Sequence, residues 1–367
     1  MPPAQPKYIC IDDEGGDRLE AILDRLRRHG LTVTLHPPAA FDDEVALIAG
    51  SSADGLLLDL RLDDVPGGTG TRVKYRAVAL AQEIRTRMTE GDVRAMPIVL
   101  WSVERKFRRS FNSDTTAHDL FDLVISKTEV STRASSVARQ LIALAKDYPS
   151  LPTSRARTST LWSRALGIPG KEREILDPRI GAELLTSPPP HEYARYILRE
   201  LLERSGPLVD ESLLAVRLGI DTLSPGWDLA KGRLELAAYR GVFCGGWERW
   251  WWPHVENILR VLSPDKPFRT LTATQRVAIL REHWGTRGFK APIASPGTGT
   301  RYWYVCAATG APIDPVDAVA VEGGDRKAWQ DRTYVSMDAV LSRRAAAKGF
   351  RIHPLEQPRI DEITRKQ

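Results

Sequence analysis

The sequence has few cysteines and no long apolar run. Its three cysteines, Cys10, Cys244 and Cys306, are odd in number, far apart and in no Cys-x-x-Cys pair. This spacing disfavours both a disulfide scaffold and a zinc site, and it favours a cytoplasmic protein. Residues 1–7 carry three prolines but no apolar segment of a secretory signal, and no apolar run approaches the roughly 18 residues of a membrane helix. We therefore expect neither secretion nor a membrane partner.

Length and composition set broad limits. The chain has 367 residues, of which 42% are hydrophobic and 27% are charged, as in a soluble globular protein with room for two domains. Residues 1–148 contain 20 Lys and Arg against 22 Asp and Glu, a net charge of −2, and residues 149–367 contain 32 against 25, a net charge of +7. A basic second half could meet nucleic acid, an acidic protein or an anionic surface, but an excess of this size favours a solvated basic surface.

One acid stands inside an apolar stretch of the first half. Residues 54–64 read Asp-Gly-Leu-Leu-Leu-Asp-Leu-Arg-Leu-Asp-Asp, with Asp59 between leucines. A stretch that is apolar on both faces is typical of a buried parallel strand. A carboxylate is costly there unless it lies at the carboxyl end of the strand with charged partners. We therefore predict that Asp59 belongs to a functional site.

Further strands and helices are predicted to alternate around this stretch. Besides the strand through Asp59, the predicted strands are Lys7–Asp12, Leu31–Leu35, Pro97–Ser102 and Asp122–Ser126. The predicted helices between and after them include Phe41–Ala49, Val73–Met88, a short one near Thr116–Phe121, and Val130–Tyr148. Such alternation indicates an α/β fold with a parallel sheet that helices cover on both faces.

Polar residues lie where four of these strands end. Asp12 and Asp13 end the first strand, Asp59 the third and Ser102 the fourth, while Lys127 follows the fifth. In an open parallel sheet, ligands lie outside the carboxyl ends of the strands. We therefore expect these five side chains to share one crevice.

Three carboxylates in one crevice repel each other unless a cation lies between them. Mg²⁺ fits this arrangement because it binds oxygen ligands from one or two carboxylates and from phosphate. Asp59 is then a candidate nucleophile that forms an aspartyl phosphate. The ammonium group of Lys127 and the hydroxyl of Ser102 would meet the charge on the phosphoryl oxygens.

Four motifs carry a family resemblance: Ile-Asp-Asp-Glu, Leu-Leu-Leu-Asp-Leu-Arg-Leu, Pro-Ile-Val-Leu-Trp-Ser and Val-Ile-Ser-Lys. In this order and spacing, they resemble the receiver domain of two-component response regulators over about residues 7–148. The resemblance implies a flavodoxin-like five-stranded parallel sheet in the order 2-1-3-4-5, phosphotransfer from a histidine kinase, and a conformational change passed to an output region. The family's acidic pair falls on Asp12 and Asp13, its phosphoacceptor on Asp59, its switch hydroxyl on Ser102 and its lysine on Lys127. Mg²⁺ is then expected at Asp12, Asp13 and Asp59.

The sequence departs from this family at several positions. Thr128 replaces the proline that usually follows the lysine, Val124 replaces a switch aromatic, and Val103 replaces a small residue after the hydroxyl. The segment between Asp59 and Ser102 is also longer than usual. A degenerate receiver that is never phosphorylated is the alternative interpretation, but retention of all five chemical groups favours phosphorylation. A glycine-rich run, 67–71, lacks the Gly-Lys-Ser/Thr ending of a P-loop and is interpreted as a flexible loop.

The predicted domains are a receiver at 1–148, a linker at 149–160 and a mainly helical, Trp-rich output domain at 161–367. The linker is rich in proline, serine and arginine and has few apolar residues. The predicted helices beyond it are Glu192–Ser205, Glu211–Leu218, Trp227–Tyr239, Pro253–Leu262, Thr272–Trp284 and Ser336–Lys348, and Tyr302–Ala307 is predicted to be a strand. No catalytic constellation is visible in this half.

Two segments of the second half suggest different outputs. Residues 214–221 contain the Ala-x-x-x-Gly turn of a helix-turn-helix, but Pro225 and Gly226 fall where the recognition helix should begin. Residues 246–254 contain four of the ten tryptophans. These tryptophans are interpreted as core residues and partners of Arg240 or Arg249, and the alternative is a protein-interaction surface.

The sequence thus predicts a cytoplasmic response regulator that accepts a phosphoryl group on Asp59 from a histidine kinase. Its output is predicted to be a contact between the Trp-rich domain and a protein partner. A DNA-binding transcriptional regulator is the second interpretation, and an unrecognised effector enzyme in residues 161–367 is the third. Beyond the phosphoryl chemistry of the receiver we expect no enzyme, and a homodimer is left open.

Overall fold

The computed structural model describes residues 4–63, 72–103, 119–151, 159–168, 176–186, 189–324 and 326–366. Several predictions fall elsewhere in the chain. The glycine-rich run 67–71, most of the short helix predicted near Thr116–Phe121, and residues 152–158 of the predicted linker lie outside the described residues.

The chain divides into two compact units. The first comprises the residues up to Arg199 together with Arg240–Trp247, and the second comprises Glu200–Tyr239 and the residues from Glu248 onward. Residue 148, the predicted end of the first domain, lies inside the first unit, and the predicted division into domains stays a prediction.

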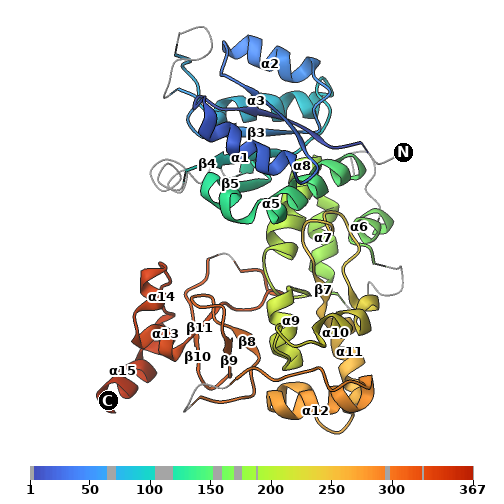
Figure 1. Ribbon diagram of the computed structural model, residues 1–367, viewed down its shortest axis with the longest axis vertical. Helices are drawn as coiled ribbons and strands as arrows, with labels where there is room; N and C mark the ends of the chain where they lie inside the picture. Colours follow the sequence, from blue (N-terminus) through green and yellow to red (C-terminus); the bar gives the residue numbers. More distant parts are fainter. Residues whose placement is uncertain are drawn as a thin grey trace. The chain divides into compact units, whose positions relative to one another are not determined.

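A five-stranded parallel sheet organises the first unit (Figure 1). Its strands are β1 (Lys7–Ile11), β2 (Thr32–His36), β3 (Gly55–Asp59), β4 (Ile98–Ser102) and β5 (Leu123–Ser126). The strand order is β2-β1-β3-β4-β5, and every neighbouring pair is parallel. This is the order that the resemblance to receiver domains implied, and β3 is the central strand, buried along its whole length. Its leucines are covered on both faces, which explains why the strand lacks an alternating pattern.

Helices cover both faces of this sheet. They are α1 (Asp17–Arg27), α2 (Phe41–Gly50), α3 (Ala77–Glu90) and α5 (Lys127–Asp147). Helices α1 and α5 contact each other, as do α2 and α3. The core beneath α2 and α3 is built from Val45, Ile48, Leu80 and Ile84 against Leu56 and its neighbours in the sheet. The predicted α/β architecture of this half is confirmed.

A buried polar network lies at the amino end of β4 and β5. The Arg85 guanidinium, 3% exposed, is 2.7 Å from Asp122 Oδ2, and the Tyr148 hydroxyl donates to Asp122 Oδ1 at 3.0 Å. The backbone N–H of Ile98, the first residue of β4, also donates to Asp122 Oδ2, at 2.8 Å. Arg85 further donates to the carbonyl of Met96. We call Arg85, Asp122 and Tyr148 the amino-edge network; in it, one positive and one negative charge balance.

The first unit continues beyond α5. It includes α6 (Ser159–Ala165), α7 (Pro178–Thr186) and α8 (Pro190–Tyr196). Residues 240–247 return to this unit and pack on the last turns of α5, where the Phe243 N–H donates to Asp147 Oδ2 at 2.5 Å. A Cβ atom on Gly246 would lie 2.8 Å from the Gln140 Cα, so only glycine allows this close approach.

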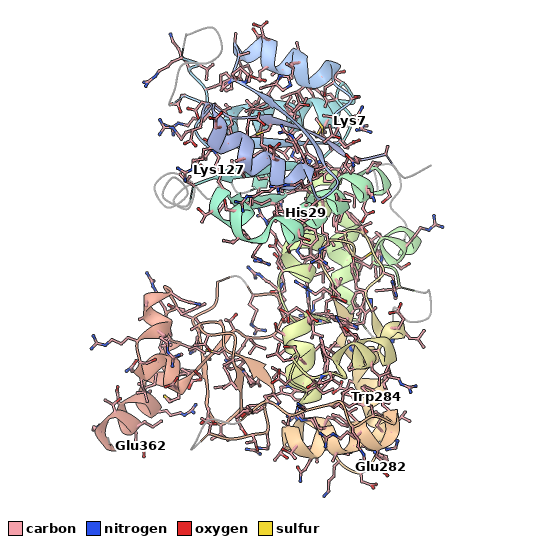
Figure 2. All side chains as sticks on the ribbon, in the orientation of Figure 1. Lys7, His29, Lys127, Glu282, Trp284 and Glu362 are labelled. Carbon is pink, nitrogen blue, oxygen red and sulfur yellow. The ribbon has the colours of Figure 1, made fainter. Side chains whose placement is uncertain are left out.

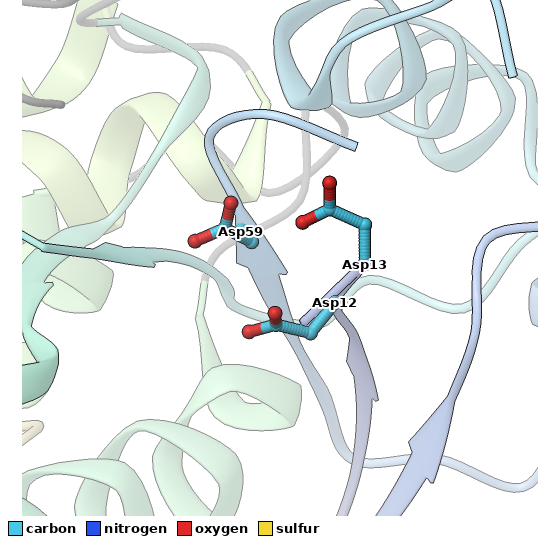
Figure 3. Close-up of side chains that lie close together, drawn as sticks. All are labelled: Asp12, Asp13 and Asp59. Carbon is cyan, nitrogen blue, oxygen red and sulfur yellow. The ribbon is translucent and has the colours of Figure 1, made fainter. Parts of the chain in front are cut away.

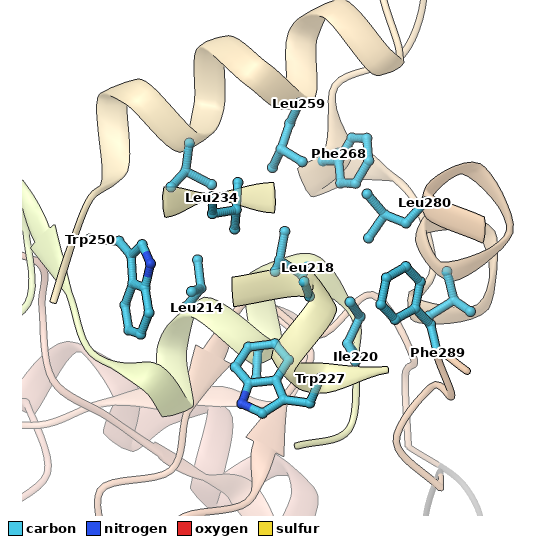
Figure 4. Close-up of a cluster of buried hydrophobic side chains, with 14 of the residues drawn as sticks. Leu214, Leu218, Ile220, Trp227, Leu234, Trp250, Leu259, Phe268, Leu280 and Phe289 are labelled. Carbon is cyan, nitrogen blue, oxygen red and sulfur yellow. The ribbon is translucent and has the colours of Figure 1, made fainter. Parts of the chain in front are cut away.

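The second unit has a helical core (Figure 4). Its helices are α9 (Glu211–Leu218), α10 (Trp227–Arg233), α11 (Trp252–Leu262) and α12 (Ala273–Trp284). A π-helix (Ile197–Leu202) follows α8, and two short strands that are far apart in the sequence, β6 (Leu208–Val209) and β7 (Trp250–Trp251), pair in antiparallel orientation. Helix α9 is confirmed at its predicted bounds, and its residues from Leu213 to Leu218 are all buried. Helix α12 begins with a capping box formed by Thr272 and Gln275, within one residue of its predicted start at Thr272.

The tryptophans of residues 246–254 are mostly core residues. Trp247, Trp250 and Trp251 are each 5% exposed or less. The interpretation of this segment as an exposed tryptophan surface is therefore wrong for these three side chains. The Arg217 guanidinium lies 4.6 Å from the Trp252 ring centroid. Stacking of these tryptophans on Arg240 or Arg249 stays a prediction.

Small strands and helices end the chain. They are β8 (Tyr304–Val305), β9 (Pro312–Ile313), β10 (Ala318–Ala320), β11 (Tyr334–Ser336), α13 (Met337–Leu341), α14 (Arg344–Ala347) and α15 (Gln357–Lys366). The strand predicted at 302–307 is confirmed in β8, while α15 was not predicted. Within the described ranges, every helix is too short or too polar to cross a membrane.

Candidate functional site

Three carboxylates meet at the carboxyl end of the sheet (Figure 3). Asp12 and Asp13 follow β1, and Asp59 is the last residue of β3, the neighbouring strand. One carboxylate oxygen of each residue lies within 4.8 Å of those of the other two. Among the described residues, this is the one group of acidic, histidine or cysteine side chains close enough to hold a metal ion. We call Asp12, Asp13 and Asp59 the acidic cluster.

The acidic cluster is buried. Asp12, Asp13 and Asp59 are 2%, 5% and 0% exposed. Two of the carboxylates accept hydrogen bonds from the backbone that follows them: the Glu14 N–H donates to Asp12 Oδ1 at 3.0 Å, and the Arg61 N–H donates to Asp59 Oδ2 at 3.1 Å. These bonds fix the carboxylates in place, but three buried negative charges remain costly without cations.

Lys127 brings a positive charge to this cluster. It is the first residue of α5, directly after β5, and it is labelled in Figure 2. Its Nζ atom lies 2.8 Å from Asp12 Oδ2 and 3.1 Å from Asp59 Oδ1. A third acid, Glu14, reaches the same atom at 3.3 Å. The sequence placed Glu14 near the first strand end but did not single it out as a partner of Lys127.

The pKa values of the cluster reflect this crowding. Burial raises the pKa of Asp12 to about 7; the nearby Lys127 ammonium opposes this rise, and the Asp59 carboxylate adds to it. Burial lowers the pKa of Lys127, but the carboxylates of Asp59 and Asp12 more than offset that effect and raise it above the ordinary value. Lys127 is therefore charged, and one ammonium is shared among several acids.

Ser102 lies at the same end of the sheet. It is the last residue of β4 and is fully buried. In the register of the sheet, Trp101 pairs with Asp59 and Ser102 pairs with Ser126, the residue before Lys127. Within the part of the chain that the structure describes, the Ser102 Oγ has no hydrogen-bond partner. All five residues predicted from strand ends thus lie at the carboxyl edge, and the Ser102 hydroxyl is buried there without a partner among the described residues.

The departures from the family pattern have local consequences. Helix α5 begins at Lys127 without an intervening loop, because the Ser126 hydroxyl accepts from the Thr128 N–H at 3.3 Å and caps the helix. Arg133 has non-helical dihedral angles (φ −131°, ψ 35°), so α5 is broken after its first turns. Val124, at the position of the switch aromatic, is 38% exposed. Val103 lines a cavity of about 520 Å³ together with Glu14 and Lys127.

Three features identify the fold of this part of the chain: the order of its strands, the positions of its acids and the position of its lysine. A parallel sheet in the order 2-1-3-4-5 carries acids after its first and third strands and a lysine after its fifth. It has the receiver fold. Within this receiver part, Lys127 is not on the opposite edge from Asp59 but in contact with it.

No protein-family model matches the chain, and no curated protein matches it. It is similar to 69 solved chains. One is NtrX from Brucella abortus, at 19% identity and a TM-score of 0.29, over 38% of this chain and 27% of NtrX. A two-component response regulator from Clostridium difficile shows 18% identity and a TM-score of 0.26, over 36% and 95% of the two chains. The receiver domain of a Pseudomonas aeruginosa sensor histidine kinase, solved with a magnesium ion in its active-site cleft, shows 17% identity and a TM-score of 0.26, over 37% and 98%.

Proposed function

We propose that the receiver part accepts a phosphoryl group on Asp59 and that the protein is a two-component response regulator. The observation that carries this proposal is the contact of the Lys127 Nζ with Asp59 Oδ1, at 3.1 Å, inside a buried cluster of three acids. A structural ion pair needs one carboxylate for one ammonium. Here the carboxylates outnumber the single ammonium, and the excess negative charge requires a further cation. A phosphoryl-transfer site needs such a cation to stabilise the charge on the phosphoryl oxygens.

The acidic cluster fits Mg²⁺. Its three residues offer carboxylate oxygens within 4.8 Å of one another, and oxygen is the ligand type that Mg²⁺ prefers. Asp12, Asp13 and Asp59 would hold the ion. When bound, Mg²⁺ would neutralise charge on the carboxylates and on the incoming phosphoryl oxygens.

The chain's own groups divide the remaining tasks. A histidine kinase would donate the phosphoryl group: the bond from phosphorus to the histidine nitrogen breaks, and a bond to a carboxylate oxygen of Asp59 forms. Lys127, now shared between Asp12 and Asp59, would pair with a phosphoryl oxygen. The buried Ser102 hydroxyl would donate a hydrogen bond to another, which would give its unpartnered oxygen a role.

The output is proposed to be contact with a protein. Helix α9, the first helix of the helix-turn-helix candidate, is buried along most of its length and so is part of the core. The second unit instead exposes large apolar side chains, among them Leu236 and Ile293, each 95% exposed. Leucine and isoleucine side chains suit contact with a protein rather than with nucleic acid, whose binding surfaces are basic and polar.

The phosphorylation proposal is tested by intact-mass measurement after incubation with acetyl phosphate and Mg²⁺. We expect the wild type to gain one phosphate and Asp59→Asn to gain none. Asp42→Asn, which changes an exposed acid of α2, is the matched control and is expected to behave like the wild type. Equal labelling of Asp59→Asn, or no labelling of any form, contradicts the proposal.

The output proposal is tested separately by gel shift with genomic fragments. We expect only weak, sequence-independent binding that disappears as salt increases. Sequence-dependent binding would instead support the DNA-binding regulator.

A further inference from the structure

A cavity of about 670 Å³ lies within the second unit. Its lining residues fall in the ranges 203–217, 304–305, 321–334 and 350–353, all of which belong to that unit. The volume lies in the range of roughly 300–1,000 Å³ that is typical of pockets for small molecules. No residue of the acidic cluster contributes to the lining, so this cavity is separate from the proposed phosphorylation site.

A buried arginine lines the cavity. Arg217 is only 3% exposed, and its Nη2 donates to Asp331 Oδ2 at 2.6 Å. Among the residues that the structure describes, its Nε has no hydrogen-bond partner. The guanidinium is held in place by two rings, since its Cζ lies 4.6 Å from the Trp252 centroid and 5.4 Å from the Trp303 centroid. A guanidinium group carries several N–H donors, so one carboxylate leaves Arg217 with donors for a further anion.

A second buried arginine adds positive charge behind this wall. Arg276 is fully buried, and its Cζ lies 5.8 Å from the centroid of the same Trp303 ring. Its hydrogen bonds in the described part of the chain go to backbone carbonyls, among them that of Arg217 at 2.7 Å. Burial lowers the pKa of Arg276 to about 10, so it stays charged at neutral pH. Two buried guanidinium groups therefore adjoin one ring, while Asp331 is the carboxylate that pairs with Arg217.

The remaining lining is balanced in charge and partly aromatic. Beyond Arg217 and Asp331, it contains three acids and three arginines, so the excess positive charge lies at the buried arginines. Tyr304 and Tyr334, both half-buried, stack with their centroids 4.1 Å apart and their planes at 29°. Stacked tyrosines offer a flat apolar face, on which a further planar ring packs favourably.

We propose that this cavity binds a small organic anion that carries a planar ring, with the anionic group at Arg217 and the ring against Tyr304 and Tyr334. Phosphate and carboxylate groups share this chemistry, because both pair with a guanidinium in bidentate geometry. Asp331 competes with the ligand for Arg217. The second unit then responds to a small molecule, a function that goes beyond phosphorylation of the receiver.

The test is isothermal titration calorimetry on the full-length, unphosphorylated protein with two kinds of ring-bearing anion. Ribonucleoside monophosphates carry a phosphate and indole-3-acetate carries a carboxylate, so the kind that binds identifies the anionic group. We expect one kind to bind with one-to-one stoichiometry. The nucleosides and indole, which lack the anion, and ribose 5-phosphate and acetate, which lack the ring, should bind at least about tenfold more weakly. The proposal is wrong if neither kind of ring-bearing anion binds, or if the partial ligands bind equally well.

Two variants then locate the bound ligand. Arg217→Gln should weaken binding at least about tenfold, because a charged hydrogen-bond donor is lost, and its melting temperature shows whether it folds. Asp331→Asn removes the competing carboxylate from a partly exposed position, so binding should become several-fold tighter. Asp265→Asn, an exposed acid of the same unit outside the cavity, is the matched control and should bind like the wild type. If Asp331→Asn binds no more tightly than this control, the ligand does not use Arg217 and the proposal is overturned, whether or not Arg217→Gln folds.

Discussion

The two edges of the receiver sheet carry buried charge in different proportions. At the amino edge, one guanidinium and one carboxylate, Arg85 and Asp122, pair at 2.7 Å, with a tyrosine hydroxyl and backbone groups filling the remaining hydrogen-bond positions. At the carboxyl edge, the one ammonium group of Lys127 pairs with three carboxylates, those of Asp12, Glu14 and Asp59. In the amino-edge network, the charges cancel and the polar groups are hydrogen-bonded within the protein, so the network stabilises the fold. In the acidic cluster, the excess negative charge is neutralised only when a cation binds.

The substitution with the largest expected effect on stability removes the positive charge of the amino-edge network. Arg85→Met leaves the Asp122 carboxylate buried without its counter-charge, and we expect a loss of about 3–5 kcal/mol in the free energy of unfolding. Urea denaturation measures it. Arg87→Met, on the exposed face of the same helix, is the control and should change stability far less. A loss no larger than the control's would show that the network is not a stabilising unit.

At the carboxyl edge, Lys127→Met removes the shared ammonium. We expect a loss of about 2–3 kcal/mol without Mg²⁺, because Asp12 and Asp59 lose their common counter-charge. Unlike the loss at the amino edge, this one should largely disappear when Mg²⁺ is added. Lys146→Met, an exposed lysine of the same helix, is the control. If Mg²⁺ restored the stability of Arg85→Met as much as that of Lys127→Met, the proposed difference between the two edges would be wrong.

Mg²⁺ itself should stabilise the wild type. At about one hundred times its dissociation constant, a ligand of the folded state adds about 2.7 kcal/mol, so the melting temperature should rise with Mg²⁺ concentration. In Asp13→Asn this rise should be much smaller, since one ligand carboxylate is lost. Asp17→Asn, an exposed acid at the start of α1, should respond like the wild type. An undiminished rise in Asp13→Asn would exclude this residue as a ligand.

The smallest effect is expected from Tyr148→Phe. The change removes the hydroxyl that donates to Asp122 Oδ1 and accepts from Arg85, while the ion pair stays. A loss of about 1 kcal/mol in the free energy of unfolding is expected. Combined with Arg85→Met, the two losses should not add, because the residues share one network. Additive losses would mean that Tyr148 acts independently.

The sequence predicts those features that depend on local pattern. The run of leucines before Asp59 predicts a central strand, and parallel topology then brings the polar strand ends together, so the five site residues follow without coordinates. The start of α5 was predicted at Val130 but lies at Lys127; the pattern of Ser126 followed three residues later by Glu129, which is typical of a helix start, was not used in the prediction.

Contacts between buried residues that are far apart in the sequence could not be predicted in this way. Arg85 lies in an amphipathic helix where an arginine usually faces solvent, and nothing local indicates that Asp122 will meet it in the interior. Arg276 is likewise fully buried and donates to the carbonyls of Val216 and Arg217 at the end of α9. These contacts join residues far apart in the chain, and a single sequence carries no record of them.

The break in α5 at Arg133 limits how far a displacement of Lys127 can travel. An unbroken helix would transmit a displacement of its first residue to its last turn. In α5, the turns before Arg133 are separated by the break from the turns after it. The later turns are fixed by two hydrogen bonds: the Tyr8 hydroxyl donates to the Leu141 carbonyl, and the Phe243 N–H donates to Asp147. We therefore expect a displacement of Lys127 to move mainly the end of β5 and the first turns of α5.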